Sequence, residues 1–281
     1  MAEPASPTYS IVTTCKGRLD DLKKSLPRFA AQPDAEVIVV DYDCPEHCGE
    51  WVATEFPAVK VVAVPDRPLF NLPDARNHGA KMATGKVLVF LDADIIVAED
   101  FLERTKFPGR KKVFGAFEAF GNRNSLRGSS MIRRVDFEAL EGFDELLSGY
   151  GGEDLDMYMR LRISGAEQVD LDEAGIEEVI EQTREERQRH RPPNLTLQFL
   201  RGQLYQLAKE LVMRSHALER LDLPARKQIM AMVDRQVGPL FKGEKDFEMT
   251  IELPDLYQRR FLKRWEFTTA VSVRAKRKSG D

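Results

Sequence analysis

Residues 87–94 have the sequence VLVFLDAD, and this stretch decides the fold. Five apolar residues in succession predict a strand buried on both faces, as in the centre of a parallel sheet. Asp92 and Asp94 follow at positions i and i+2, and in an extended backbone such residues point to the same side. Two like charges there favour a cation between them, and carboxylate ligands suit Mg²⁺ or Mn²⁺ shared with substrate phosphates. The alternative is a pair of solvated loop acids, because an isolated Asp-x-Asp is common.

Composition limits the class of protein. The chain has 281 residues, of which 42% are hydrophobic and 31% charged, as expected for one large globular α/β domain or one domain plus an appendage. The net charge of −4 gives no argument for nucleic acid as a partner. We find no run of about 18 apolar residues and no basic or apolar signal region. Sparse cysteines favour reduced thiols and a cytoplasmic location.

Strand and helix patterns alternate through the first half of the chain. The expected strands cover residues 9–14, 36–41, 59–64 and 87–92, and the expected helices cover residues 19–30, 50–56 and 74–83. This order predicts a mostly parallel, doubly wound α/β sheet with right-handed crossovers. Because ligands bind beyond the carboxyl ends of the strands in such sheets, the site should involve residues 13–18, 41–43, 65–71 and 92–94.

The second half has a less regular pattern. We expect strands at 112–120, 129–133, 169–171 and 176–180, a helix at 153–164, helical structure over 195–237 with a break near Asp222 and Pro224, and strands at 247–253 and 267–273. This predicts one domain over residues 1–190 and a helical and β-hairpin extension over residues 191–281.

Two further segments, the basic tail and the segment with Cys44 and Cys48, allow more than one interpretation. Residues 255–281 contain eight Lys or Arg and three acidic residues, which predicts either a solvated face or contact with an anionic membrane or polymer. Cys44, His47 and Cys48 lie close together beside Asp43, like half of a zinc site. No second Cys/His pair follows them, so the sequence gives little support for a metal there.

Five motifs occur in order along the chain. They are SIVTTCKGR at 10–18, VVDYD at 39–43, ARNHG at 75–79 followed by ATG at 83–85, FLDAD at 90–94, and GGED at 151–154. Together they resemble the family 2 glycosyltransferases of the GT-A fold, over roughly residues 8–185, and GGED resembles an acidic motif shared with β-galactosyltransferases. The resemblance implies a doubly wound mixed sheet with a helical and small β C-terminal extension. It also implies an inverting transferase that uses a UDP-sugar donor and Mn²⁺ or Mg²⁺.

The expected chemistry assigns roles to the acidic residues. Sugar transfer must stabilise a departing diphosphate, and a divalent ion held by Asp94, with Asp92 alongside or reaching the ribose, would neutralise that charge. A carboxylate near the acceptor hydroxyl must take its proton, and Asp154 is our candidate base. Glu153 is then expected to bind acceptor hydroxyls. The alternative is that these acids only favour the start of a helix.

Donor binding is expected at the first two motifs. Thr13, Thr14 and Arg18 belong to the first strand and its loop, and Arg18 and Arg76 suit contacts with phosphate. Arg76 has the alternative role of an internal salt bridge that orders Asp92. Asp41 or Asp43 would accept from the nucleotide base. Tyr42 replaces the second acid of the usual Asp-Asp pair, so it either stacks on the base or packs in the core.

The metal site departs from the family pattern at its third ligand. Related enzymes often supply a His just after the last sheet strand, where this chain has Glu181-Gln182-Thr183. His190 lies downstream between two arginines and is either a metal ligand or a surface residue. Gln182 could coordinate weakly through its amide oxygen.

Two other functions compete with sugar transfer. A nucleotidyltransferase also uses acidic metal ligands on such a sheet, but the segment 13–18 contains a single glycine where a Gly-rich phosphate loop is expected. A catalytically impaired carbohydrate-binding module is favoured by Gln182. The expected partners are a nucleotide-sugar donor, a saccharide or other hydroxyl acceptor, and peripherally a membrane through the basic C-terminus. The loops at 118–130 and 145–152 and the C-terminal region should select the acceptor.

Overall fold

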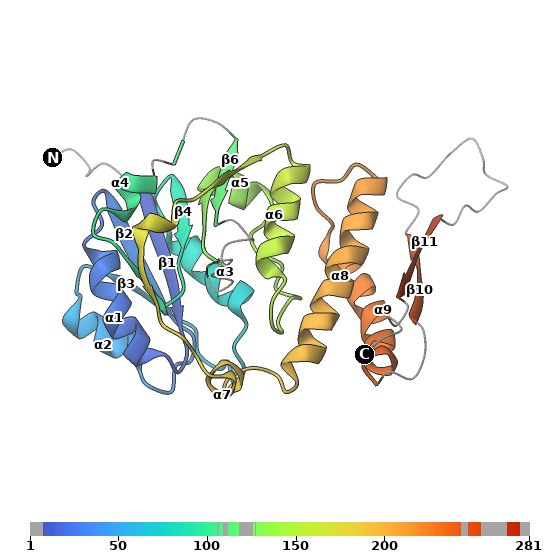
Figure 1. Ribbon diagram of the computed structural model, residues 1–281, viewed down its shortest axis with the longest axis horizontal. Helices are drawn as coiled ribbons and strands as arrows, with labels where there is room; N and C mark the ends of the chain where they lie inside the picture. Colours follow the sequence, from blue (N-terminus) through green and yellow to red (C-terminus); the bar gives the residue numbers. More distant parts are fainter. Residues whose placement is uncertain are drawn as a thin grey trace. The chain divides into compact units, whose positions relative to one another are not determined.

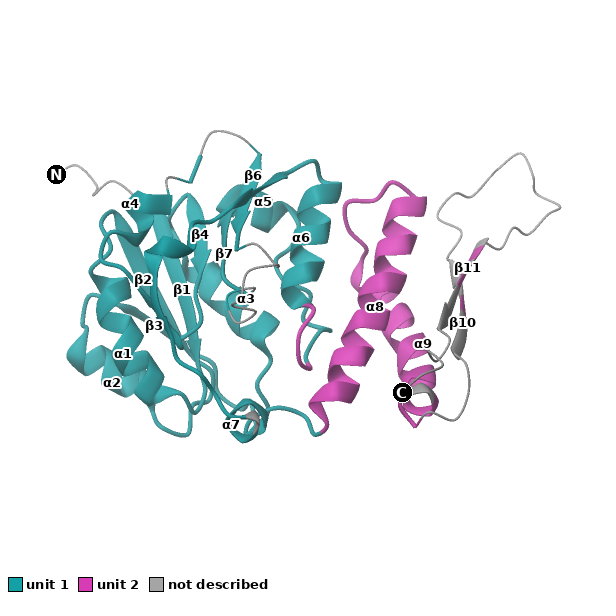
Figure 2. Ribbon diagram, viewed as in Figure 1, with its two compact units in different colours: residues 1–148, 153–193 teal, residues 149–152, 194–281 magenta. Residues whose placement is uncertain are grey.

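A computed structural model of the protein describes residues 8–105, 107–108, 112–117, 126, 128–242, 247–253 and 269–275. The chain divides into two compact units (Figure 2). Unit 1 comprises Met1–Ser148 and Glu153–Pro193, and unit 2 comprises Gly149–Gly152 and Asn194–Asp281. The individual residues that the sequence analysis names as candidates for donor binding, metal binding and catalysis lie in unit 1, whereas residues 149–152 and the C-terminal region, which it expects to select the acceptor, lie in unit 2.

A seven-stranded mixed sheet forms the centre of unit 1 among the described residues (Figure 1). The strand order is β3-β2-β1-β4-β7-β6-β8. The strands are β1 (Tyr9–Cys15), β2 (Ala35–Asp41), β3 (Lys60–Ala63), β4 (Val87–Phe90), β6 (Val113–Ala116), β7 (Ser130–Arg133) and β8 (Glu167–Asp170). The four strands β3, β2, β1 and β4 are parallel, as predicted, whereas β7 runs antiparallel to both β4 and β6.

Helices cover both faces of this sheet, because successive strand residues point to opposite sides. In β4, Val87 and Val89 pack in one core with α1 (Leu19–Ala30), α2 (Cys48–Glu55) and α4 (Phe101–Thr105). Leu88 and Phe90 pack in the other core with α3 (Leu72–Met82), α5 (Arg134–Ala139) and α6 (Glu153–Ile163). The strand that opens the sequence argument is therefore buried on both faces, as predicted.

A second, two-stranded sheet fixes the chain immediately after Asp94. Its strands are β5 (Ile95–Val97) and β9 (Ile176–Val179), which pair antiparallel. The N–H of Ile180 donates to the carbonyl of Asp94 at 2.8 Å. The sequence analysis missed β5, because three residues are too few to establish a period. It also missed α4, α5 and α7 (Arg184–Gln188), which have only five or six residues each.

Unit 2 contains helices α8 (Leu195–Ser215) and α9 (Leu223–Phe241) and the antiparallel strands β10 (Phe247–Leu253) and β11 (Thr269–Ala275). The predicted helical break and both predicted strands are confirmed. No helix in the described part of the chain is long and apolar enough to cross a membrane. The basic residues of the tail other than Arg274, and residues 118–125 and 127 of the expected acceptor loop, lie outside the described residues.

Close packing of α3 on the sheet depends on a glycine. A Cβ atom at Gly79 would lie 2.5 Å from Val12 Cγ1 and 2.9 Å from Val40 Cγ2, so the helix backbone approaches β1 and β2 directly. Arg76 lies one turn earlier on the same helix. The position of Arg76 at the ends of the strands is thus set by this contact.

We expect Gly79→Ala to lower the free energy of unfolding by about 1–3 kcal/mol, because the two β-branched valines must shift to admit a methyl group. Urea denaturation of the purified protein measures the change. Lys81→Ala, at an exposed position of the same helix, is the matched control and should have little effect. Equal stability of the two variants would show that α3 has room to move away from the sheet.

Candidate active site

A buried ion pair joins α3 to the end of β4. Arg76 is 1% exposed, and its Nη2 donates to Asp92 Oδ1 at 2.8 Å. The guanidinium lies over the rings of Phe90 and Phe143, 5.7 and 5.5 Å from their centroids. Its Nη1 is buried with no hydrogen-bond partner among the described residues. Arg76 therefore has the internal role considered above, the ordering of Asp92, and keeps one donor group for a further acceptor.

Asp94 meets a different arginine. The guanidinium of Arg18, at the start of α1, donates from Nη2 to Asp94 Oδ2 at 3.1 Å, from Nε to Asp21 Oδ2 at 2.5 Å, and from Nη1 to Gln182 Oε1. Burial and the charge of Asp92 raise the pKa of Asp94 to about 6, against the opposing effect of Arg18. Gln182 lies at the expected position of the third metal ligand. Gln182 and Asp94 thus both accept hydrogen bonds from the guanidinium of Arg18.

The two aspartates do not leave an extended strand together, so that expectation is wrong. Strand β4 ends at Phe90, and the N–H of Ile95 donates to the carbonyl of Asp92 at 3.1 Å in the turn that follows. The turn is needed because the next residues enter β5, which pairs in a different sheet. The two carboxylates are nevertheless near enough for Asp92 to disfavour ionisation of Asp94.

Glu153 and Asp154 are the first residues of α6 and are both buried. Burial and the charge of Glu153 raise the pKa of Asp154 to about 7, although the N–H of Leu155 and the charge of Arg76 favour its ionised form. Burial in the protein and the charge of Glu153 therefore outweigh the groups that favour the ionised form of Asp154. Arg76 interacts electrostatically with both Asp92 and Glu153, so α6 and β4 present one acidic cluster.

In the motif at 39–43, Asp41 and Tyr42 are engaged within the protein, and Asp43 has an exposed carboxylate. Both carboxylate oxygens of Asp41 accept backbone N–H groups, from Cys44 at 2.9 Å and Gly49 at 2.8 Å. Tyr42 is 1% exposed, contacts Phe70 edge-on and belongs to the core, which resolves the earlier alternative against base stacking. The side chain of Asp43 is 44% exposed, beside Lys16 at 3.6 Å.

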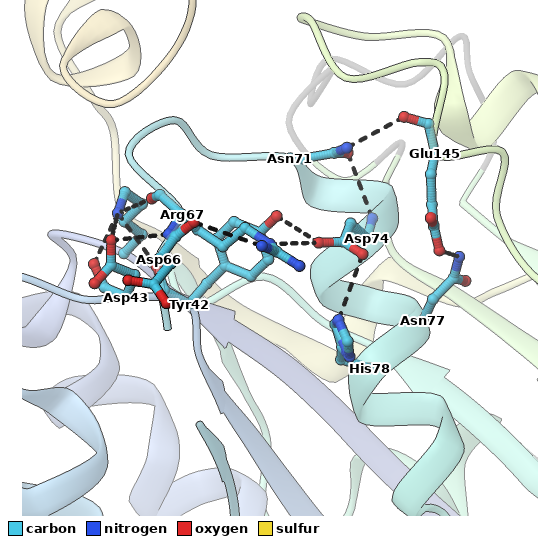
Figure 3. A network of polar contacts seen from close by, with 10 residues as sticks. Tyr42, Asp43, Asp66, Arg67, Asn71, Asp74, Asn77, His78 and Glu145 are labelled. Carbon is cyan, nitrogen blue, oxygen red and sulfur yellow. Dashed lines mark hydrogen bonds and ion pairs between the residues drawn. The ribbon is translucent and has the colours of Figure 1, made fainter. Parts of the chain in front are cut away.

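A polar network holds these loops in place. Figure 3 shows side chains converging on Asp74, which accepts from Tyr42 Oη at 2.5 Å and Arg67 Nε at 3.3 Å. His78 Nε2 lies 3.5 Å from the same carboxylate. Arg67 also donates its backbone N–H to Asp43 Oδ2 at 3.1 Å. The segment between β3 and α3 is thereby fixed to the loop that carries Asp43.

Sequence reasoning missed Lys16 and Asp74. Lys16 is buried, and its Nζ donates to the carbonyls of Tyr42, Asp43 and Arg67 at 3.3, 2.7 and 2.7 Å. In the sequence, Lys16 could have been noticed as a lysine directly after a buried strand. Asp74 could have been noticed as an acid three residues after Asn71, which caps α3. Both residues position loops, so no catalytic pattern identifies them.

The remaining candidates lie in or beside β1. Thr13 and Thr14 are buried strand residues, and the Thr13 hydroxyl has no hydrogen-bond partner in the described part of the chain. His190 lies against Gly17, where a Cβ atom would be 2.2 Å from its Nε2. Burial, Lys16 and Arg189 lower the pKa of His190, which favours the neutral imidazole. Within the described residues, His190 does not join Asp92 and Asp94 in a group of ligand atoms within 4.8 Å of one another.

Comparisons with known proteins agree on a family and a fold. The family model "Glycosyl transferase family 2" matches residues 10–106, and "N-terminal domain of galactosyltransferase" matches residues 118–185. None of the curated proteins matches the sequence.

Two solved structures share the fold. The mannosyltransferase PcManGT from Pyrobaculum calidifontis, in complex with GDP-Man and Mn²⁺, has a TM-score of 0.53 at 16% identity over 80% of this chain and 68% of that one. S. aureus TarS 1-349, in complex with UDP-GlcNAc, has a TM-score of 0.55 at 14% identity over 83% and 73%. Residues 10–106 thus match glycosyl transferase family 2, residues 118–185 match the galactosyltransferase domain, and the chain has the GT-A fold.

Proposed function

We propose that the protein transfers a sugar from a UDP-linked donor to an acceptor hydroxyl with inversion, assisted by Mn²⁺ or Mg²⁺. The observation that carries this proposal is the buried carboxylate of Asp154, whose pKa is raised to about 7 by burial and by Glu153. A group with this pKa is basic enough to accept a hydroxyl proton and still substantially ionised near neutral pH. The family's nucleotide-sugar chemistry requires such a group.

The acceptor side of the reaction falls to α6. Asp154 takes the acceptor hydroxyl proton as the oxygen forms its bond to the anomeric carbon, while the bond to the diphosphate breaks and its electron pair leaves with the diphosphate. One displacement with one base gives inversion. Glu153, the neighbouring buried acid, is assigned to binding acceptor hydroxyls. Arg76 interacts with both acids, which limits the repulsion between them.

The donor side falls to residues at the ends of β1, β2 and β4. Asp43 has an exposed carboxylate and is assigned to the nucleotide base, whereas both oxygens of Asp41 are engaged in the loop itself. Thr13 and Thr14 precede the phosphate-binding segment. Arg18 presents a guanidinium suited to phosphate, and Arg76 has an unused Nη1.

Asp92 and Asp94 are suited to hold the divalent ion. Even with Arg18 at 3.1 Å, Asp94 has a pKa of about 6, so its negative charge is incompletely compensated. The carboxylate oxygens and the amide oxygen of Gln182 are hard donors of the type that Mn²⁺ and Mg²⁺ take. A bound ion would supply neutralisation of the departing diphosphate. His190 stays our candidate for a further ligand.

One observation favours a second function, the binding of a nucleotide sugar without transfer. Arg18 already bridges Asp94 and Gln182, so a cation of the protein occupies the position between these oxygen donors. Hydrolysis of a panel of nucleotide sugars, assayed with and without Mn²⁺, distinguishes the two functions. Mn²⁺-dependent hydrolysis supports the transferase, and UDP binding without any hydrolysis or transfer supports the alternative.

Substitutions should separate the two acids. We expect Asp154→Asn to lower kcat by about 10²–10⁴-fold while leaving UDP affinity nearly unchanged, because it removes only the base. Asp94→Asn should remove the Mn²⁺ dependence of both turnover and UDP binding. Asp100→Asn, which alters an exposed acid on the same unit, is the control for both. Equal losses of UDP affinity in the Asp94 and Asp154 variants would contradict this division of roles.

Activity should depend on pH through Asp154. Because the base must be ionised, kcat/KM should fall about tenfold per pH unit below the pKa of about 7. The residual activity of Asp154→Asn should lack this acidic limb. A steady-state pH profile at saturating Mn²⁺ measures both. An unchanged acidic limb in the variant would assign the titration to another group.

Stability should show the opposite dependence on pH. The folded-state pKa values of Asp94 and Asp154, about 6 and about 7, exceed the ordinary value of 3.8, so the folded protein binds more protons than the unfolded chain between these values. The contribution of these two carboxyl groups to stability therefore falls as the pH rises from 4 to 7. At pH 8 we expect Asp154→Asn to be more stable than the wild type by on the order of 1–3 kcal/mol, with the difference vanishing near pH 4. Denaturant titrations at both pH values test this, and a pH-independent difference would contradict it.

A further inference from the structure

All three cysteines of the chain meet in one buried cluster. Cys15 ends β1, Cys44 lies in the loop after β2, and Cys48 begins α2. Their Sγ atoms lie within 4.8 Å of one another, and the residues are 0%, 6% and 0% exposed. The sequence analysis recognised only Cys44 and Cys48, because Cys15 lies far from them in sequence. Parallel pairing of Cys15 with Asp41 brings the third thiol to the same place.

We propose that Cys15, Cys44 and Cys48 bind one Zn²⁺ ion in a structural site separate from the sugar-transfer site. The Sγ atoms of Cys15 and Cys44 are 3.9 Å apart. Two thiolates bound to one tetrahedral zinc at about 2.3 Å lie about 3.8 Å apart, so this pair is already spaced as zinc ligands. The third thiol is within reach of the same point. Core packing alone does not require three thiols to converge, whereas a zinc site does.

The three thiols differ in how readily they ionise. The backbone N–H of Gly17 donates to Cys44 Sγ at 3.3 Å. Hydrogen bonds from the other two thiols and from the N–H groups of Gly17 and Glu46 lower the pKa of Cys44, whereas hydrogen bonds within the cluster and burial raise the pKa of Cys15 and of Cys48. The proposal therefore rests on the spacing of the three sulfur atoms, and the metal would displace the protons of the other two thiols.

The chemistry of binding is balanced by proton release. Three thiols that bind Zn²⁺ as thiolates release up to three protons, and no oxidant or reductant is required. Thiolates select soft or borderline cations and bind Mg²⁺ and Mn²⁺ poorly. The Mn²⁺ or Mg²⁺ ion proposed at Asp92 and Asp94 should therefore not compete with Zn²⁺ for the three thiols. The ring of His47 is 74% exposed and takes no part. A water molecule would complete the tetrahedron, because among the described residues His190 does not join the three thiols in the group of ligand atoms within 4.8 Å of one another.

Such an ion would fasten two loops of the donor site. Cys15 is followed by Lys16, Gly17 and Arg18, and Cys44 follows directly after Asp43. The ion would therefore hold the proposed phosphate-binding and base-binding segments on the sheet. Its removal should loosen these loops without touching Asp154.

The test measures metal in the full-length protein purified under reducing conditions without chelator. We expect about one Zn²⁺ per chain by elemental mass spectrometry, and thiolate-to-cobalt charge-transfer absorption when Co²⁺ replaces it. Cys48→Ser should weaken Zn²⁺ affinity at least about tenfold, whereas His47→Ala should retain it. Asp94→Asn should also retain one Zn²⁺, which separates this site from the proposed donor metal and keeps the two proposals independently testable.

Three results would overturn the proposal. They are reduced wild-type protein that neither holds Zn²⁺ nor gives the cobalt absorption, zinc that is lost in Asp94→Asn but kept in Cys48→Ser, and a Cys15–Cys44 disulfide found by intact mass in the fresh protein. Because Cys48→Ser alters a buried residue, a second measurement uses the wild type alone. A thiol-modifying reagent should release Zn²⁺ in proportion to the thiols modified, and modification without release would equally refute the site.

Discussion

The buried ion pair between Arg76 and Asp92 is the interaction on which the rest of the site depends. Removing a guanidinium from water costs several kcal/mol, and a single carboxylate seldom offsets this cost. Here Asp92 at 2.8 Å, two aromatic faces and the charge of Glu153 act together. That arrangement requires α3 to lie directly on the sheet, which Gly79 permits, and α6 to begin beside the end of β4. The ion pair thus couples the donor and acceptor sides of the site.

Burial of Asp94 and Asp154 makes their ionised forms energetically unfavourable. Asp94 and Asp154 have raised pKa values because protein surrounds them and neighbouring acids repel them. Each would be more stable neutral, yet a metal ligand and a general base must both be able to ionise. A cation at Asp94 and a hydroxyl donor at Asp154 would relieve this conflict. If these residues have the proposed roles, binding would therefore relieve an unfavourable electrostatic energy of the unliganded protein.

Sequence reasoning succeeded where the deciding contacts are local and failed where they are not. The apolar run of β4 and the period of α1 predicted their elements, because burial on a sheet face follows from residue spacing. The role of Tyr42 could not be predicted, since its partner Asp74 lies 32 positions away. Asp41 was likewise unpredictable, because its two backbone donors are supplied by a loop whose path no local pattern fixes. Motifs indicated a candidate site, and long-range pairing decides which of its residues remain available to a ligand.

The parallel register of β1, β2 and β4 explains why two kinds of cation site can form at one edge of the sheet. Cys15 is opposite Asp41, and Val12 is opposite Phe90. The three strands therefore end close to one another at the same edge of the sheet. The exit of β4 carries carboxylates, which take hard cations, and the exits of β1 and β2 carry thiols, which take soft ones. Donor chemistry separates the sites, so each can retain its own metal without a barrier between them. A loop fastened by thiolates would then present Asp43 and Arg18 independently of a metal held by Asp92 and Asp94.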